Sequence, residues 1–341
     1  MTGTSIETCL TDLLSSSSSA SEASFLRQAE LKASLLGLCR AANQIASLAA
    51  HNGLSTEQLG ALSGAQNEDG DDQKQLDVLA DQIVAEVLLK AGIHSYFSEE
   101  RTDIVGLNAA GTLGVACDPL DGSSNIDTNL TIGTIFSIFD MTDCQTDEAG
   151  KAYLPPIGRK QIAAGMFVYG PQTSLLLAYD QKIYAFAKGQ DGGFYHLDWD
   201  VSIPQDSSEF AINASNVAFW PAGIQAYFHD LSQGARAAKS GMRWAGSLVA
   251  DCYRICRRGG VFLYPQDRRD GYQSGRLRLV YEANPIALLI EAAGGMASTG
   301  QNPILDEAVT DLHQRVPLLF GSAAEMKHLL SIISSHKDPA L

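Results

Sequence analysis

The order of hydrophobic patterns along the chain constrains its fold more than any other feature. Apolar residues recur at helical spacing over residues 31–49 and again over 76–88, which predicts two amphipathic helices. Six β-prone runs follow with few helical patterns among them, at 95–98, 112–117, 133–140, 161–169, 174–179 and 182–187. Amphipathic helices followed by consecutive strands bury their apolar faces by packing on a sheet. The first half of the chain therefore predicts helices covering a sheet.

The second half alternates between the two patterns. Helical spacing predicts helices at 221–238, 247–257, 285–293 and 323–335, and strand patterns occur at 261–264, 276–281 and 316–321. We therefore expect an α/β protein in several layers. The stretch 196–210 is the best candidate boundary, which gives an N-terminal domain over 25–200 and a C-terminal domain over 201–341. The Ser-rich residues 1–24 predict a mobile arm, and the acidic segment 64–72 predicts a loop.

The charge of the chain excludes several classes of partner. The 341 residues include 24 Lys and Arg against 39 Asp and Glu, a formal net charge of −15. This charge repels nucleic acids and anionic membrane surfaces, so we expect neither as a partner. No apolar stretch reaches the roughly 18 residues of a membrane span, and no secretory leader pattern is found. We expect a cytoplasmic protein.

The six cysteines are scattered and include no CxxC pair, which indicates reduced thiols. Cys252 and Cys256 are four residues apart on one face of an expected helix. Two such thiols supply at most half of a zinc site, and we expect them to pack in the core. Cys144 has no neighbouring cysteine in the sequence, so regulation by a disulfide is not expected.

The motif that carries chemistry is CDPLDGSSNID at residues 117–127. Pro119 cannot extend a central strand, so we expect the chain to turn where Asp118 emerges, with Asp121 three residues later. Two carboxylates this close repel each other unless a cation lies between them. The following Gly-Ser-Ser-Asn offers backbone N–H groups and hydroxyls that attract phosphate. An ordinary Asx-rich turn is the alternative, but the combination of these features favours a metal and phosphate site.

Further acids follow other predicted elements. Glu99 and Glu100 close the run at 95–98, and Glu282 follows the run at 276–281. Taken alone, Glu99 and Glu100 are better explained as solvated charge than as functional acids. Asp77 opens a helix, where it is either a partner of the helix dipole or a functional carboxylate. Carboxylate oxygens without a His or Cys cluster suit Mg²⁺ or Mn²⁺ rather than zinc.

Metal-assisted phosphoryl chemistry also needs a positioned water and protein cations that hold the rest of the substrate. Basic residues concentrate late in this acidic chain, at Arg243, Arg254, Arg257, Arg258, Arg268, Arg269, Arg276 and Arg278. Some of them are expected to be surface residues.

These motifs together resemble class 1 fructose-1,6-bisphosphatase. FSEE precedes DPLDGSSNID and GTIFSIF follows it, and later RWAGSLVADCYR, GGVFLYP, LRLVYEANPIALLIEAAGGMA and HQRVPLLFGS match the family in the same order. The resemblance covers about residues 30 to 335. It implies a layered α-β-α-β-α sugar phosphatase fold with mixed sheets, a homotetramer, and hydrolysis of the 1-phosphate of fructose 1,6-bisphosphate in gluconeogenesis or the Calvin cycle.

The resemblance also implies a role for individual residues. The divalent ions, Mg²⁺ or Mn²⁺, would be bound by Glu99, Asp118, the Leu120 carbonyl, Asp121 and Glu282. The attacking water would be oriented and deprotonated by Asp77 and Glu100. The 1-phosphate would be held by Asp121, Gly122, Ser123 and Ser124. The sugar and the 6-phosphate would be gripped by Asn213, Tyr264 and Arg276, while Arg243 would reach the 6-phosphate of a neighbouring subunit.

Two alternatives stay open at this point. The DPxDG element is shared with a wider superfamily, so an inositol-phosphate or nucleotide 3'-phosphate phosphatase is the nearest competitor. An inositol monophosphatase relative would be expected to have the dipeptide Trp-Asp at the position where this chain has Tyr281 and Glu282. A non-catalytic sensor that kept the fold is the second alternative, and it would require the loss of an acid, whereas every acid is present.

Three departures from the family pattern bear on specificity and regulation. Trp244 replaces a tyrosine, Asn216 lies where a tyrosine is usual, and Arg276 replaces a lysine, so the phosphate pocket stays cationic but altered. These changes leave open whether sedoheptulose 1,7-bisphosphate is also accepted. AMP-inhibited members have a Lys-Tyr pair where this chain has Thr112 and Leu113, so we expect AMP inhibition to be weak or absent.

Overall fold

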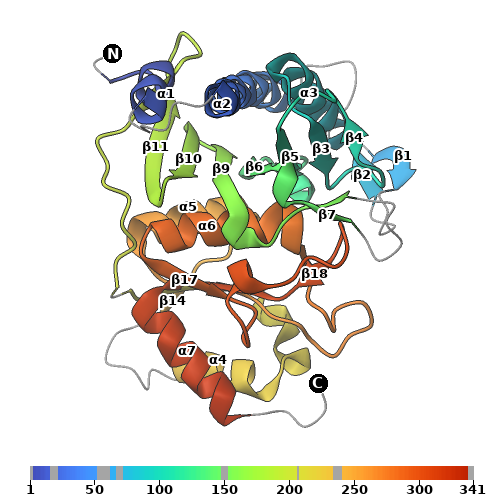
Figure 1. The fold of residues 1–341 in the computed structure, drawn as a ribbon. Helices are drawn as coiled ribbons and strands as arrows, with labels where there is room; N and C mark the ends of the chain where they lie inside the picture. The colour runs from blue at the N-terminus through green and yellow to red at the C-terminus, as the bar shows by residue number, and fades with distance from the viewer. Residues whose placement is uncertain are drawn as a thin grey trace.

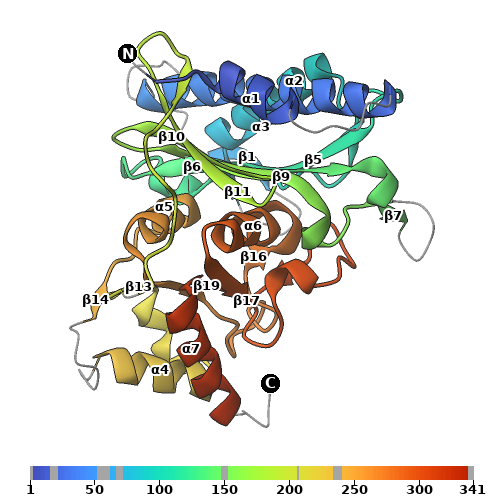
Figure 2. The same cartoon turned by 60° about the vertical axis from the view of Figure 1, so that its left-hand side comes forward.

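Five layers make up the fold. The computed structural model describes residues 3–15, 22–51, 62–66, 72–146, 153–205, 207–232 and 240–336. From top to bottom in Figure 1 the layers are helices, a sheet, helices, a second sheet and helices, and Figure 2 shows the same order after rotation. Both large sheets contain parallel and antiparallel pairs. The expected α-β-α-β-α class with mixed sheets is confirmed.

The first layer contains α1 (Ile6–Ser15), α2 (Glu22–Ala50) and α3 (Gln75–Ala91), which cover one face of an eight-stranded sheet. The strands run in the order β12 (Phe194–His196), β11 (Lys182–Lys188), β10 (Thr173–Tyr179), β9 (Gln161–Tyr169), β6 (Ile132–Asp140), β5 (Leu113–Asp121), β3 (Ser95–Ser98) and β4 (Val105–Gly106). Every residue of β5 and β6 is buried. Side chains alternate along each strand, so Phe136 joins the core under the first helix layer and Ile135 joins the core on the other face.

The third layer consists of α5 (Leu248–Arg258) and α6 (Asn284–Ala292), which lie between the two sheets. Below them is a five-stranded sheet in the order β14 (Gly241–Met242), β13 (Glu209–Ile212), β15 (Val261–Tyr264), β19 (Leu318–Ser322) and β17 (Gly295–Ser298). The last layer is α4 (Ala222–Ser232) with α7 (Ala323–Ser335). The described residues also form three separate two-stranded sheets: β1 (Leu62–Gln66) with β2 (Asp72–Lys74), β7 (Gln145–Thr146) with β8 (Tyr153–Leu154), and β16 (Leu277–Arg278) with β18 (Arg315–Val316).

The middle helices supply buried residues to the core between the two sheets. Cys252 and Cys256 of α5 are fully buried in the core shared by both sheets, which confirms their expected role in packing. All six cysteines fall within the described residues and are free thiols. Within the same ranges, none of the helices combines the length and the apolar composition that crossing a membrane requires.

Two expectations for the first 72 residues are wrong where the structure describes them. The expected mobile arm contains α1, whose Ile6, Leu10 and Leu14 are buried against the first helix layer, because three apolar residues at helical spacing suffice to dock a short helix. The expected loop at 64–72 contributes to β1 and β2, and its residues 67–71 lie outside the described residues. The division at residue 200 stays a prediction, since one core cluster draws buried side chains from both segments.

Candidate active site

A β-bulge aims two carboxylates in one direction. Residues three apart in a regular strand point to opposite faces. In β5, however, the pairing shifts from Asp118 opposite Ile135 to Asp121 opposite Gly133. This shift brings both carboxylates to the same side. The strand therefore continues through Pro119 instead of turning there as expected, and the missing N–H of proline falls within the irregular segment, where no ladder bond is required.

The second carboxylate also caps a distant helix. Asp121 accepts hydrogen bonds from the Ser247 hydroxyl at 2.8 Å and from the N–H groups of Leu248 at 3.3 Å and Val249 at 3.0 Å, at the beginning of α5. Burial raises the pKa of Asp121, and these three hydrogen bonds partly oppose the rise. Gly122 follows with φ of 77°, a conformation that favours glycine, and leads into a short 3₁₀ turn at Ser123–Asn125.

Glu282 reaches the site from a π-helical turn, not from the strand expected at 276–281. Its strand part, β16, is two residues long, and Leu279–Ala283 then winds into a π-helix that leads into α6. The Glu282 carboxylate accepts the N–H of Arg278 at 2.6 Å. Burial raises the pKa of Glu282 to about 7; the hydrogen bond from Arg278 opposes this rise and the Asp121 charge adds to it. Single π-helical turns next to an α-helix are frequent at functional sites.

Glu99 joins the cluster because β3 and β5 are parallel. Ser98 pairs with Cys117, and the N–H of Glu99 bonds to the Cys117 carbonyl at 3.1 Å, which places Glu99 beside Asp118. The carboxyl ends of parallel strands are where α/β proteins bind ligands. Burial and then the charges of Asp118 and Glu282 raise the pKa of Glu99 well above its ordinary value. The Nε of Arg278 lies 3.7 Å from the Glu99 carboxylate.

Asp77 combines the two roles that its sequence context left open. It is the third residue of α3, and its Oδ2 accepts the N–H of Lys74 at 2.8 Å, as a capping residue does. Its Oδ1 is buried and has no hydrogen-bond partner among the described residues. Burial raises the pKa of Asp77 to about 6. The side chain therefore both caps the helix and lines the cavity described next.

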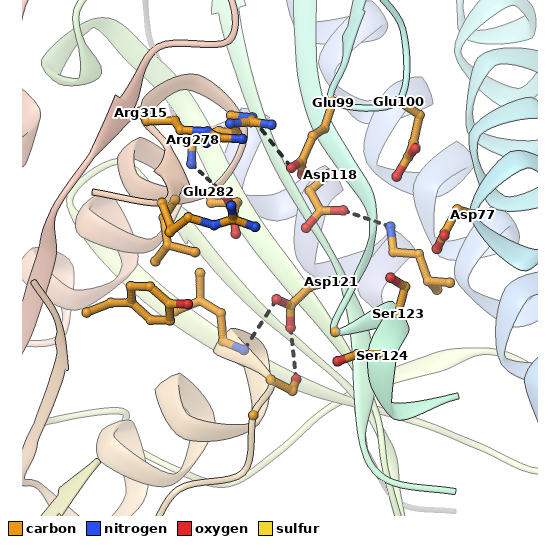
Figure 3. A pocket seen from close by; sticks show the side chains of 18 of the residues that line it. Asp77, Glu99, Glu100, Asp118, Asp121, Ser123, Ser124, Arg278, Glu282 and Arg315 are labelled. Atoms are coloured by element: carbon orange, nitrogen blue, oxygen red, sulfur yellow. Dashed lines mark hydrogen bonds and ion pairs between the residues drawn. The ribbon is translucent and has the colours of Figure 1, made fainter. Parts of the chain in front are cut away.

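The predicted acids lie around one cavity of about 500 Å³ (Figure 3). One carboxylate oxygen each of Asp118, Asp121 and Glu282 lies within 4.8 Å of the other two, and all three residues are buried. Burial and then the charges of Asp121 and Glu282 raise the pKa of Asp118 well above its ordinary value. Twelve of the predicted site residues line this space: Asp77, Glu99, Glu100, Asp118, Leu120, Asp121, Gly122, Ser123, Ser124, Tyr264, Arg276 and Glu282.

Two predicted site residues lie elsewhere within the described ranges. Asn213 lines a small adjoining hollow that shares Tyr264 with the main cavity, and its amide oxygen accepts the N–H and the hydroxyl of Ser215. Arg243 is exposed beside β14. Neither contributes to the cavity lining within this chain.

Sequence reasoning did not place several residues that line the cavity: Trp244, Gly246, Ser247, Leu248, Phe262, Arg278 and Arg315. Ser247 had a recognisable signal, because a serine before an apolar helix is a typical N-cap. Arg278 belongs to the basic group identified in the sequence, but the predicted substrate contact is its neighbour Arg276. Arg278 differs from the exposed members of that group because it is almost completely buried beside Glu99.

The residues present fit divalent cations. Repelling, buried carboxylates with raised pKa values are the expected state of a cation site whose charge is not balanced. Hard oxygen donors are the ligands that Mg²⁺ and Mn²⁺ prefer. The cluster is therefore a buried group of acids with the chemistry to hold a divalent cation, not a solvated acidic surface.

Comparisons with known proteins agree on one family. Residues 14–198 match the family profile described as "Fructose-1-6-bisphosphatase, N-terminal domain", and residues 203–334 match its C-terminal domain. A class 1 fructose-1,6-bisphosphatase of Sinorhizobium medicae is 47% identical over 307 residues, covering 89% of this chain and 86% of that protein. One from Cereibacter sphaeroides is 44% identical over 306 residues, covering 88% and 90%.

A solved structure agrees over nearly the whole chain. The holo form of Leishmania major fructose-1,6-bisphosphatase superposes with a TM-score of 0.86 at 26% identity, and the match covers 98% of this chain and 100% of that one. The two solved forms differ in their fit, since the apo form of the same enzyme gives a TM-score of 0.81.

Proposed function

Because the chain belongs to the class 1 fructose-1,6-bisphosphatase family and hydrolyses fructose 1,6-bisphosphate, we propose that the acidic cavity is the place of that reaction. The observation that carries this assignment is the convergence of three buried carboxylates from β5 and the π-helical turn, joined by the half-buried Glu99 after β3, beside the Gly122–Asn125 turn. The reaction consumes water and releases the phosphate at carbon 1 of the sugar.

Glu99, Asp118, Asp121 and Glu282, with the Leu120 carbonyl, would hold Mg²⁺ or Mn²⁺ in this proposal. Bound divalent ions supply Lewis-acid activation of water and neutralise phosphoryl charge. The remaining contributions come from protein groups. Asp77 lines the cavity, and with a pKa of about 6 it is ionised at neutral pH yet basic enough to accept a proton from water. Glu100 lines the same space and would orient that water.

The 1-phosphate would bind at the turn that follows the bulge. Gly122 has no side chain to block approach to the backbone, and Ser123 and Ser124 place hydroxyls at the cavity wall (Figure 3). Backbone N–H groups at the start of a helical turn donate to phosphate oxygens. The 1-phosphate that is attacked would thus lie between this turn and the carboxylate cluster.

Arg276 and Tyr264 would receive the other end of the substrate. Both line the cavity, and the Arg276 guanidinium lies 4.9 Å from the ring centroid of Tyr272. Arg269 lies 4.0 Å from the same ring, so Tyr272 is held by two cations. This contact orders the segment that presents Arg276. Asn213, from the adjoining hollow, and Arg243 of a neighbouring subunit would complete the contacts, and the homotetramer and the cytoplasmic location stay predictions.

Replacing Arg276 by glutamine is expected to raise KM for fructose 1,6-bisphosphate about tenfold or more and to change kcat little, because a charge-assisted contact to phosphate is lost far from the reacting atoms. Steady-state kinetics at saturating Mg²⁺ measure this. Arg276→Lys keeps the charge and should retain most of the affinity. Arg258→Gln is the matched control, since Arg258 is 65% exposed and pairs with Glu209. A wild-type KM for the glutamine variant would exclude Arg276 from substrate binding.

AMP is expected to leave the activity unchanged. The N–H and hydroxyl of Thr112 both donate to the Glu30 carboxylate, at 3.0 and 2.8 Å, which ties α2 to the start of β5. At the paired end of β6, Asp140 forms an ion pair with Arg27. The donors at this place are thus already engaged by carboxylates: those of Thr112 by Glu30, and Arg27 by Asp140. Millimolar AMP should therefore change the rate by less than about twofold. Cooperative inhibition in a turnover assay at fixed Mg²⁺ would contradict this expectation.

Phosphate release from a panel of substrates tests the proposed function directly. With Mg²⁺, fructose 1,6-bisphosphate should be hydrolysed and inositol 1-phosphate should not. Sedoheptulose 1,7-bisphosphate is one carbon longer, and a cavity of about 500 Å³ has room for it, so we propose that it is a second substrate. Side-by-side values of kcat/KM decide the balance between the two sugars. A preference for inositol 1-phosphate would overturn the assignment.

A further inference from the structure

A buried carboxylate behind the cavity binds the turn that carries two of its acids. Asp81 lies four residues after Asp77 on α3, so the two share one face of the helix. Asp81 is 5% exposed and does not belong to the set of described residues that line the cavity. A buried acid that is not a ligand needs partners of its own, because burying an unpaired charge is unfavourable.

Three donors satisfy the Asp81 carboxylate. Oδ1 accepts the Tyr96 hydroxyl at 3.0 Å and the Ser98 hydroxyl at 2.6 Å. Oδ2 accepts the Nε–H of Arg101 at 2.6 Å. Tyr96 and Ser98 belong to the end of β3, and Arg101 follows Glu100 directly. All three donors therefore flank Glu99 and Glu100.

The contact extends to the backbone of Glu100 through one atom. The Ser98 hydroxyl donates to Asp81 and at the same time accepts the N–H of Glu100 at 3.2 Å. The turn is closed by a hydrogen bond from the Arg101 N–H to the Ser98 carbonyl at 3.3 Å. The path from α3 to the Glu100 backbone thus consists of two consecutive hydrogen bonds. Movement of Glu100 away from α3 would break at least one of them.

We propose that Asp81 is a positioning residue for the cation site, which holds the Glu99–Glu100 turn in register with Asp77 and β5. This inference rests on the proposed function of the cavity. Glu99 and Asp118 repel each other, and Glu99 experiences the charge of Glu282 as well, so the turn is driven outward unless it is anchored. Asp81 opposes that displacement from the helix side, while the Glu99 N–H bond to Cys117 fixes the strand side. Groups that orient the ligands of a metal typically change its affinity 10- to 100-fold.

Mn²⁺ binding to the resting protein tests this proposal without relying on turnover. Free Mn²⁺, counted by electron paramagnetic resonance after metal removal and titration, should reveal at least about tenfold weaker binding for Asp81→Asn. Ser98→Ala breaks the link to Glu100 but leaves the ion pair with Arg101, and it too should weaken binding, by a smaller factor. At high Mg²⁺ the Ser98→Ala variant should recover most of the wild-type kcat.

Glu86→Gln is the matched control, because it makes the same chemical change on the same helix at an exposed residue that pairs with Lys90 at 3.9 Å. It should bind Mn²⁺ within about twofold of wild type. Melting in a chelator reports whether each variant folds, and Ser98→Ala decides the question if Asp81→Asn does not fold. Folded variants with wild-type Mn²⁺ affinity would overturn the proposal. Failure of the wild-type protein to hydrolyse fructose 1,6-bisphosphate would instead overturn the proposed function.

Discussion

Replacing Asp118 by asparagine is expected to lower kcat by about three orders of magnitude or more, since several kcal/mol of transition-state stabilisation depend on cations held by full carboxylate charges. The substitution is conservative for the fold. Asparagine keeps an oxygen where Oδ1 accepts the Leu120 N–H at 2.9 Å, so the bulge in β5 should survive. The effect should thus appear in kcat at saturating substrate and Mg²⁺.

The same variant should melt at a higher temperature than wild type when both are metal-free. Burial and two neighbouring carboxylates oppose ionisation of Asp118, and a neutral amide removes that repulsion. Lower activity with higher stability is the signature of a functional charge cluster, whereas a structural residue would lose both. Asp103→Asn, at an exposed acid in the loop after β3, is the matched control. Turnover near the wild-type rate for Asp118→Asn would refute the metal assignment.

Elements with an unambiguous period could be predicted from the sequence. β15 is found at 261–264 and α7 at 323–335, both as expected, because their apolar residues follow a single period and Gly or Ser residues flank them. α4 ends at Ser232 within the described residues, short of the expected 238, and residues 233–239 lie outside them. The motif DPLDGSS pointed to acids that line one cavity in the structure, because paired acids beside a Gly-Ser-Ser turn are an uncommon combination.

The local geometry of the site could not be predicted, because distant partners determine it. The alternating pattern of residues 276–281 predicts a strand along its whole length. In the structure, β18 offers two residues for pairing, and the backbone that follows forms the hydrogen bonds of a π-helix instead. Pro119 predicted a turn, whereas the long pairing of β5 with β6 carries the strand past it as a bulge. Ser247 and Asp121 are 126 positions apart, and no local pattern links them.

The pH dependence of stability should reverse when metal is added. In the metal-free protein, burial raises the pKa of Glu282 from 4.5 to about 7, and the pKa values of Glu99 and Asp118 rise as well. A raised carboxyl pKa means that the folded state holds its proton more tightly than the unfolded state does. The free energy of unfolding therefore falls as pH rises from about 4.5 to 7, by roughly 3 kcal/mol for Glu282 alone.

Other groups do not mask this slope. Around Glu282, the Asp121 charge raises its pKa further, and Arg278 and Arg276 oppose the rise, so their effects are contained in the value of about 7. The acids whose pKa values are lowered, among them Glu209 beside Arg254, lose their stabilising effect below about pH 4. Measurements from pH 5 upward thus report the buried acids with raised pKa values, which include Asp77 as well as Glu282.

Thermal melting in a chelator should accordingly give a Tm that falls between pH 5 and pH 8, and millimolar Mg²⁺ should raise the Tm at pH 8 much more than at pH 5. Ligand binding stabilises by about 2.7 kcal/mol at a hundredfold excess over Kd, and protonated carboxyls compete with that binding at low pH. Glu282→Gln should flatten the slope in the chelator, because the amide does not titrate. A Tm that stays constant or rises over this range in the metal-free protein would mean that burial and neighbouring charge do not oppose ionisation of these carboxyls, and the cation site would lose its physical basis.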